Sequence, residues 1–223
     1  MEKLWVFGDS FSASFNPKTD WGRTYVSWKG YVPKTYSNLI SEEIGIDFEN
    51  KAKGGLDNYS IMESIMDTAD EIGENDIIII GWSNTIRFRV SNPRTLSWET
   101  IIPTSKFNNL EQCEISKTTV NEIMINRTHN LYEIELTKFT KFINFAFKTQ
   151  KIIHWRWDDF GRLKFYNTIE QETNLKVNDN HYSEIGHVEI SKDLIECIKN
   201  KKRVNNLANF EINLIDKNKN KLI

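Results

Sequence analysis

Four consecutive isoleucines at residues 77–80 leave few folds open to this chain. Side chains alternate between the two faces of a strand, so a run without polar residues must be covered on both faces. Such a run is typical of a central strand in a parallel sheet. It ends abruptly at Gly81-Trp82-Ser83-Asn84, which predicts a turn that carries polar side chains.

The rest of the chain alternates between strand and helix patterns. A second apolar run, residues 4–7, breaks into Gly8-Asp9-Ser10, and residues 46–50 and 151–157 also have strand character. Residues 15–34 are rich in aromatic side chains and are expected to form a long loop. Helical spacing of apolar residues is found at 36–44, 59–72, 120–148 and about 188–199.

The length of 223 residues suits one sizeable α/β domain, because no linker-like segment divides the chain. We expect that domain to cover residues 1–200, with an insertion at about 87–119 where regular periodicity is lost. The insertion is expected to border or cover the site. Residues 201–223 are expected to form a loosely attached C-terminal tail, whose apolar run at 210–215 is either an edge strand or a partner contact.

Composition excludes several classes of function. The chain has 29 Lys and Arg against 31 Asp and Glu, with no strongly basic surface predicted, so nucleic acid is not an expected partner. Cys113 and Cys197 lack the spacing of a zinc site, and no metal is expected. No secretory signal and no apolar stretch of about 18 residues is found, so we expect a cytoplasmic protein without a membrane span.

Polar residues follow the predicted strands in a regular way. Ser10, Gly55 and Asn84 each stand just beyond a strand, and Asp179 and His181 lie in a polar turn near the end of the chain. Ligands of open α/β sheets bind beyond the carboxyl ends of the strands, so Ser10 is a candidate nucleophile. On its own, Ser10 is more typical of a turn or a helix cap than of a nucleophile.

In this order and context, these residues resemble the sequence blocks of the SGNH hydrolases, also called the GDSL family. The matching segments, spread over residues 3 to about 198, are Gly8-Asp9-Ser10-Phe11-Ser12, Gly54-Gly55, Gly81-Trp82-Ser83-Asn84, Asp179-Asn180-His181 and Gly186-His187. The resemblance implies a three-layer α/β/α fold with a flavodoxin-like parallel sheet of about five strands.

The resemblance also implies a role for each matching residue. Ser10 would be the nucleophile, His181 its general base and Asp179 the acid that orients the imidazole. The backbone N–H groups of Ser10 and Gly55 and the side-chain amide of Asn84 would form the oxyanion hole.

Two departures from the family pattern leave alternatives open. Asp179 stands two residues before His181, where the family usually has three, so Asp158, Asp159 or a dyad without an acid remain alternatives. The third block is one residue longer than usual, which leaves Ser83 as an alternative oxyanion donor. His154 and His187 are expected to be structural.

The implied function is hydrolysis of a carboxylic ester through an acyl-serine intermediate, without a cofactor. We expect a small-molecule or glycan ester as substrate and favour an O-acetylated carbohydrate, because the aromatic-rich loops suit stacking on sugar rings. Asp9, Trp21 and Trp82 are assigned to substrate contact. The alternative is a binding or structural protein that keeps the fold without efficient catalysis.

Overall fold

The computed structural model describes residues 2–84, 87–101, 110, 113–126, 129–156, 166–173 and 181–199. For residues 20–21 and for those between 124 and 133 it gives the backbone alone. The predicted tail at 201–223 and its apolar run therefore lie outside the described residues.

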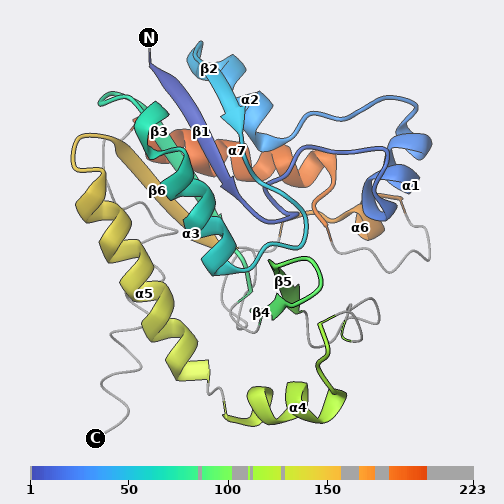
Figure 1. Cartoon of the computed structure of the whole chain (residues 1–223). Coiled ribbons are helices and arrows are strands. Elements are labelled where there is room, and N and C mark those ends of the chain that lie inside the picture. Colours follow the sequence, from blue (N-terminus) through green and yellow to red (C-terminus); the bar gives the residue numbers. More distant parts are fainter. Residues whose placement is uncertain are drawn as a thin grey trace, which may run out of the picture.

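A parallel sheet forms the centre of the protein (Figure 1). Its strands are β1 (Lys3–Gly8), β2 (Asp47–Asn50), β3 (Ile77–Trp82) and β6 (Lys151–Arg156), in the order β2-β1-β3-β6. This order is the flavodoxin-like one, which confirms the predicted fold class. In the part of the chain described, the sheet has four strands where about five were expected.

Helices cover both faces of the sheet, which explains the uniformly apolar β3. Ile77 and Ile79 pack with α2 (Tyr36–Ile44) and α7 (Glu184–Lys199) on one face. Ile78 and Ile80 pack with α3 (Asn58–Asp67) and α5 (His129–Ala146) on the other. All four isoleucines are almost fully buried, so the strand has no face on which a polar side chain could reach water.

The expectation of a long loop at residues 15–34 is wrong, because this segment contains α1 (Asp20–Lys29). The Thr19 side chain accepts a hydrogen bond from the Gly22 N–H, and Gly30 ends the helix with a φ of 78°. Both residues are typical caps. The helix was missed because its aromatic residues do not form one buried stripe. Tyr25 is buried, whereas Trp28 is exposed.

The predicted insertion has regular structure of its own. Its first part is an antiparallel hairpin of β4 (Phe88–Asn92) and β5 (Ser97–Ile101). Thr100 of this hairpin donates a hydrogen bond to Asp57 at 2.9 Å, which places the hairpin against the start of α3. The single helix expected at 120–148 is divided, with α4 (Lys117–Asn126) before α5. The helix expected at 59–72 is also divided, into α3 and the short 3₁₀ helix η1 (Ala69–Glu71), whereas α6 (Ile169–Thr173) was not predicted.

Candidate active site

The ends of β1, β2 and β3 lie at the same level of the sheet. Gly8 pairs with Gly81 in the parallel register, and the Lys53 N–H donates to the Gly8 carbonyl at 3.1 Å. Two glycines fit this crowded edge, since a Cβ on Gly81 would come within 2.1 Å of the Ser12 hydroxyl. The turns that carry Ser10, Gly55 and Asn84 therefore leave the sheet side by side.

Ser10 occupies a tight turn directly after β1. The Asp9 carbonyl accepts hydrogen bonds from the Ser12 and Ala13 N–H groups, both at 3.0 Å. Ser10 itself is 8% exposed, and its hydroxyl forms no hydrogen bond with any residue that the structure describes. A Cβ built on Gly54 would lie 3.9 Å from the Ser10 Cβ, so the second turn passes next to the serine.

Gly55 has a backbone conformation that favours glycine, with a φ of 84°. An added Cβ would meet nothing within 4 Å, so glycine is favoured at this position by the backbone angle and not by crowding.

Asp9 does not have the position expected of a substrate contact. It is fully buried, and its carboxylate accepts hydrogen bonds from the Phe11 N–H at 3.0 Å, the Ser83 hydroxyl at 2.9 Å and the Arg87 guanidinium at 3.1 Å. The prediction for Asp9 is therefore corrected: its carboxylate links the turns after β1 and β3 beneath the surface.

The turn after β3 separates the roles of Ser83 and Asn84. The Ser83 side chain is fully buried and donates to Asp9, whereas Asn84 is half-buried. The Asn58 amide accepts from the Ser83 N–H at 2.8 Å and donates to the Ser83 carbonyl at 3.1 Å. This pairing fixes the turn to the start of α3.

Trp82 is a core residue, which corrects its assignment to substrate contact. Its side chain is fully buried, stacks near Phe139 and donates from Nε1 to His154 Nδ1 at 3.1 Å. The alternation of side chains along β3 predicts this burial, because Trp82 lies on the same face of the strand as Ile78 and Ile80. The side chain of Trp21 lies outside the described residues.

His181 lies beside the Ser10 turn. Its ring stacks on the ring of Phe11, the residue after Ser10, with a centroid distance of 4.8 Å and an interplanar angle of 27°. Its carbonyl accepts a hydrogen bond from the Ile169 N–H at 2.9 Å, which fixes the backbone to α6. Asp179 and the alternative acids Asp158 and Asp159 lie outside the described residues.

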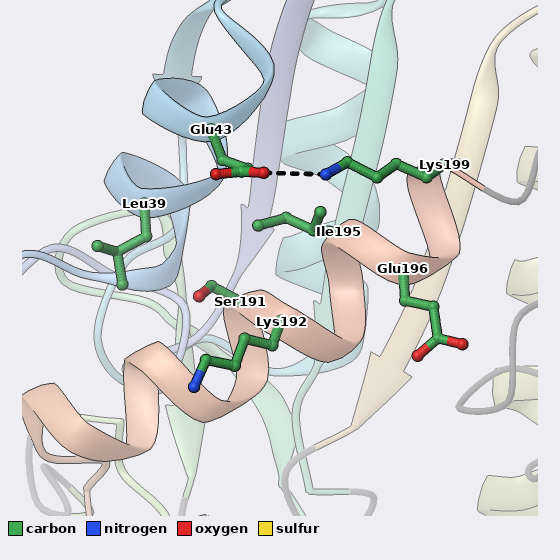
Figure 2. A pocket seen from close by; sticks show the side chains of 7 residues that line it. All are labelled: Leu39, Glu43, Ser191, Lys192, Ile195, Glu196 and Lys199. Atoms are coloured by element: carbon green, nitrogen blue, oxygen red, sulfur yellow. Dashed lines mark hydrogen bonds and ion pairs between the residues drawn. The ribbon is translucent and has the colours of Figure 1, made fainter.

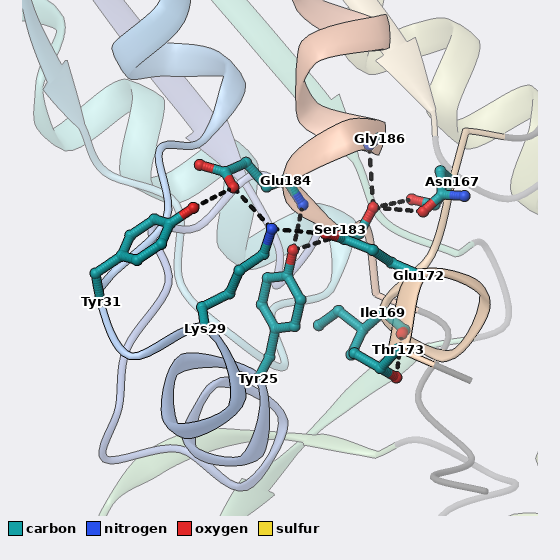
Figure 3. Close-up of polar contacts among 10 residues, drawn as sticks. All are labelled: Tyr25, Lys29, Tyr31, Asn167, Ile169, Glu172, Thr173, Ser183, Glu184 and Gly186. Atoms are coloured by element: carbon teal, nitrogen blue, oxygen red, sulfur yellow. Dashed lines mark hydrogen bonds and ion pairs between the residues drawn. The ribbon is translucent and has the colours of Figure 1, made fainter. Parts of the chain in front are cut away.

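A polar cluster ties α1 to both sides of the His181 segment (Figure 3). Lys29 forms ion pairs with Glu172 of α6 at 2.6 Å and with Glu184 of α7 at 3.0 Å. The Tyr25 hydroxyl donates to Glu172 at 2.5 Å and accepts from the Glu184 N–H at 2.8 Å. Burial lowers the pKa of the Lys29 ammonium, but its hydrogen bonds to the two carboxylates outweigh this and raise the pKa above its ordinary value.

The residues of this cluster are far apart in sequence, and neither α1 nor α6, which carry three of them, was predicted. Tyr25 is buried against Phe15 and Ile169, so it covers a core edge. Trp28 and Tyr31 are 47% and 52% exposed, so these two rings remain accessible to a ligand.

His187 and His154 have the structural positions predicted for them. His187 is 3% exposed, and its Nδ1 accepts a hydrogen bond from the Tyr36 N–H at 3.3 Å. Burial lowers the pKa of His187 to about 3, and the nearby His181 contributes in the same direction. Burial likewise lowers the pKa of His154 to about 4.

These two histidines predict a loss of stability in mild acid. In the unfolded chain they bind protons below a pKa of about 6.5, whereas the folded protein holds them neutral to much lower pH. Stability is therefore complete above about pH 6.5 and should fall below it, by about 1.4 kcal/mol per pH unit for each histidine. Urea unfolding between pH 7.5 and about pH 5 measures this, in a range where most carboxylates stay ionised. An unfolding free energy independent of pH over that range would contradict the assignment.

A groove lies between α2 and α7, away from the residues of the predicted site (Figure 2). Leu39 and Ile195 give it an apolar floor, and the ion pair of Glu43 with Lys199 spans it at 2.9 Å. None of its lining residues was predicted to act in catalysis.

The described residues contain no group of three or more His, Cys, Asp or Glu side chains placed to hold a metal ion. Nor does any helix among them have the length and apolarity needed to cross a membrane.

No protein-family model and no curated protein sequence matches the chain. Among solved structures, it is similar to a candidate lipolytic protein of the G-D-S-L family from Desulfitobacterium hafniense DCB-2, with 12% identity, a TM-score of 0.39, and 88% of this chain and 99% of that chain covered. The lipase/acylhydrolase from Enterococcus faecalis gives 15% identity, a TM-score of 0.40, and coverage of 90% and 97%. A carbohydrate esterase gives 13% identity, a TM-score of 0.43, and coverage of 90% and 65%.

Proposed function

We propose that the chain is a serine hydrolase that cleaves a carboxylic ester through an acyl-serine intermediate. The observation that carries the proposal is the stacking of the His181 ring on Phe11, directly after Ser10, at the edge where the turns after β1, β2 and β3 meet. A serine hydroxyl needs a base close by to act as a nucleophile near neutral pH, and His181 is the imidazole at this edge.

The proposed reaction has two halves. Ser10 Oγ attacks the ester carbonyl while His181 takes the hydroxyl proton, and the proton then passes to the leaving alcohol. Water attacks the acyl-serine with His181 again as base, which releases the acid and restores Ser10. Asp179 would keep the imidazole in the tautomer that accepts the proton.

The oxyanion of the tetrahedral intermediate would be bound by the N–H groups of Ser10 and Gly55 and by the Asn84 amide. The side-by-side turns, and the pairing of Asn58 with Ser83 that fixes the third of them, support this assignment. One such donor typically stabilises the transition state by about 2.7–4 kcal/mol.

For the substrate, we propose an acetyl ester on a carbohydrate. The exposed rings of Trp28, Tyr31 and the hairpin residue Trp98, which is 59% exposed, support this choice because flat aromatic surfaces suit sugar rings. Turnover of acetylated glycans beside long-chain acyl esters compares the two substrate classes directly, and preference for the long acyl chains would contradict this part of the proposal.

Replacing Ser10 by alanine is expected to reduce hydrolysis of p-nitrophenyl acetate to background, since the nucleophile is removed. Ser14, four residues later and exposed, provides the matched control, and Ser14→Ala should retain wild-type turnover. Circular dichroism of both variants checks that they fold. A folded Ser10→Ala protein with wild-type turnover would overturn the proposed function.

A further inference from the structure

Arg87 reaches two segments that the proposed mechanism needs in a fixed relation. Its Nη1 donates to the Asp9 carboxylate at 3.1 Å and to the Leu56 carbonyl at 3.0 Å. Asp9 directly precedes Ser10, and Leu56 directly follows Gly55. One guanidinium therefore contacts the neighbours of both predicted backbone donors of the oxyanion hole.

Arg87 also belongs to the segment that carries the third donor. It stands three residues after Asn84, and its N–H donates to the Asn84 carbonyl at 3.2 Å. The three turns are thus joined through a single residue, which lies outside the sequence blocks that define the family resemblance.

The contacts of Arg87 with Asp9 and Leu56 are shielded from water. They are therefore well suited to fixing the distance between the Ser10 and Gly55 turns. Asp9 is fully buried, and the Arg87 side chain is 10% exposed. Hydrogen bonds between ionised groups are stronger and shorter than neutral ones, and the planar guanidinium holds its donors in a rigid arrangement. Because Arg87 binds a neutral carbonyl as well as the carboxylate, balancing the charge of Asp9 does not account for both contacts.

We propose that Arg87 is a positioning residue that holds the Ser10 and Gly55 turns at the spacing required for oxyanion binding. It acts through Asp9 and Leu56, not on the substrate itself. The inference rests on the proposed function and adds to it a residue that the sequence motifs do not identify.

The test compares steady-state hydrolysis of p-nitrophenyl acetate by the full-length wild type, Arg87→Met and Arg87→Lys. Misplacement of catalytic groups by about 1 Å can cost about 10²-fold in rate, so Arg87→Met should lose about that much in kcat with KM nearly unchanged. Arg87→Lys keeps the positive charge beside Asp9 but lacks the rigid fork, so it should fold and show a smaller loss in kcat. Arg94→Met is the matched control, because Arg94 belongs to the same segment and its side chain is 65% exposed.

Hydrogen exchange gives a second readout that does not depend on turnover. In Arg87→Met, the peptides covering residues 9–13 and 54–58 should exchange faster than in the wild type, while Arg94→Met should leave them unchanged. Unchanged exchange in these peptides would overturn the positioning role, as would folded Arg87→Met and Arg87→Lys proteins with wild-type kcat.

The failure of this inference is distinguishable from the failure of the proposed function. An active wild type with equally active Arg87 variants overturns the role of Arg87 alone. A folded wild type that neither hydrolyses esters nor reacts with a serine-directed probe overturns both.

Discussion

Replacing His181 by asparagine is expected to reduce kcat for ester hydrolysis by a factor on the order of 10⁶, as loss of the base does in serine hydrolases. Asparagine cannot accept the proton of the Ser10 hydroxyl, so the serine remains a poor nucleophile. The His181 ring is only half-buried, so the substitution should leave the fold intact. Steady-state kinetics on p-nitrophenyl acetate, with circular dichroism of the same samples, measures the effect.

A double variant sharpens this test. Residues that act as one catalytic unit are strongly non-additive, so Ser10→Ala combined with His181→Asn should be no less active than either single variant. If the activity losses of the two single variants multiplied in the double variant, the two residues would act independently. Near wild-type turnover in His181→Asn would remove His181 from the mechanism.

The second large effect is expected at Asp179. Asp179→Asn should preserve folding and reduce turnover by as much as about 10⁴-fold, because the amide no longer holds the imidazole in the required tautomer. In an extended chain, an Asp-x-His pair places both side chains on the same side, which would bring the carboxylate beside the ring. Kinetics of Asp179→Asn beside Ser10→Ala as the inactive reference measure this.

Asp158→Asn and Asp159→Asn are the matched comparisons for Asp179. Both should retain turnover close to the wild type if Asp179 is the acid. A large loss in one of them, together with wild-type turnover in Asp179→Asn, would move the acid to that residue. Wild-type turnover in all three variants would indicate a Ser10–His181 dyad.

The layers of the fold could be predicted because they follow from local patterns. The isoleucines at 77–80 required cover on both faces, and α2 and α7 on one side with α3 and α5 on the other supply it. The helix at 20–29 was missed although Thr19 and Gly30 are typical caps, because its aromatic residues do not form one buried stripe. Attention to the caps would have found it.

The site was harder to predict, because motif spacing says which residues stand near a strand end but not which way they point. Asp9 and Trp82 both stand next to motif residues, yet both side chains are buried. The contacts of Lys29 with Glu172 and of Arg87 with Leu56 join segments distant in sequence. No local pattern specifies such pairs, so they emerge only when the chain is folded.

The most direct test of Ser10 as the nucleophile is the mass of the intact protein after reaction with a fluorophosphonate, which modifies activated serines, followed by peptide mapping. We expect one adduct per chain, located on Ser10, in the wild type and in Ser14→Ala, and none in Ser10→Ala. A folded wild type without an adduct would contradict the assignment of Ser10 as the nucleophile and would favour a binding or structural role for this fold. An adduct on a different residue would contradict the assignment as well and would move the nucleophile to that residue.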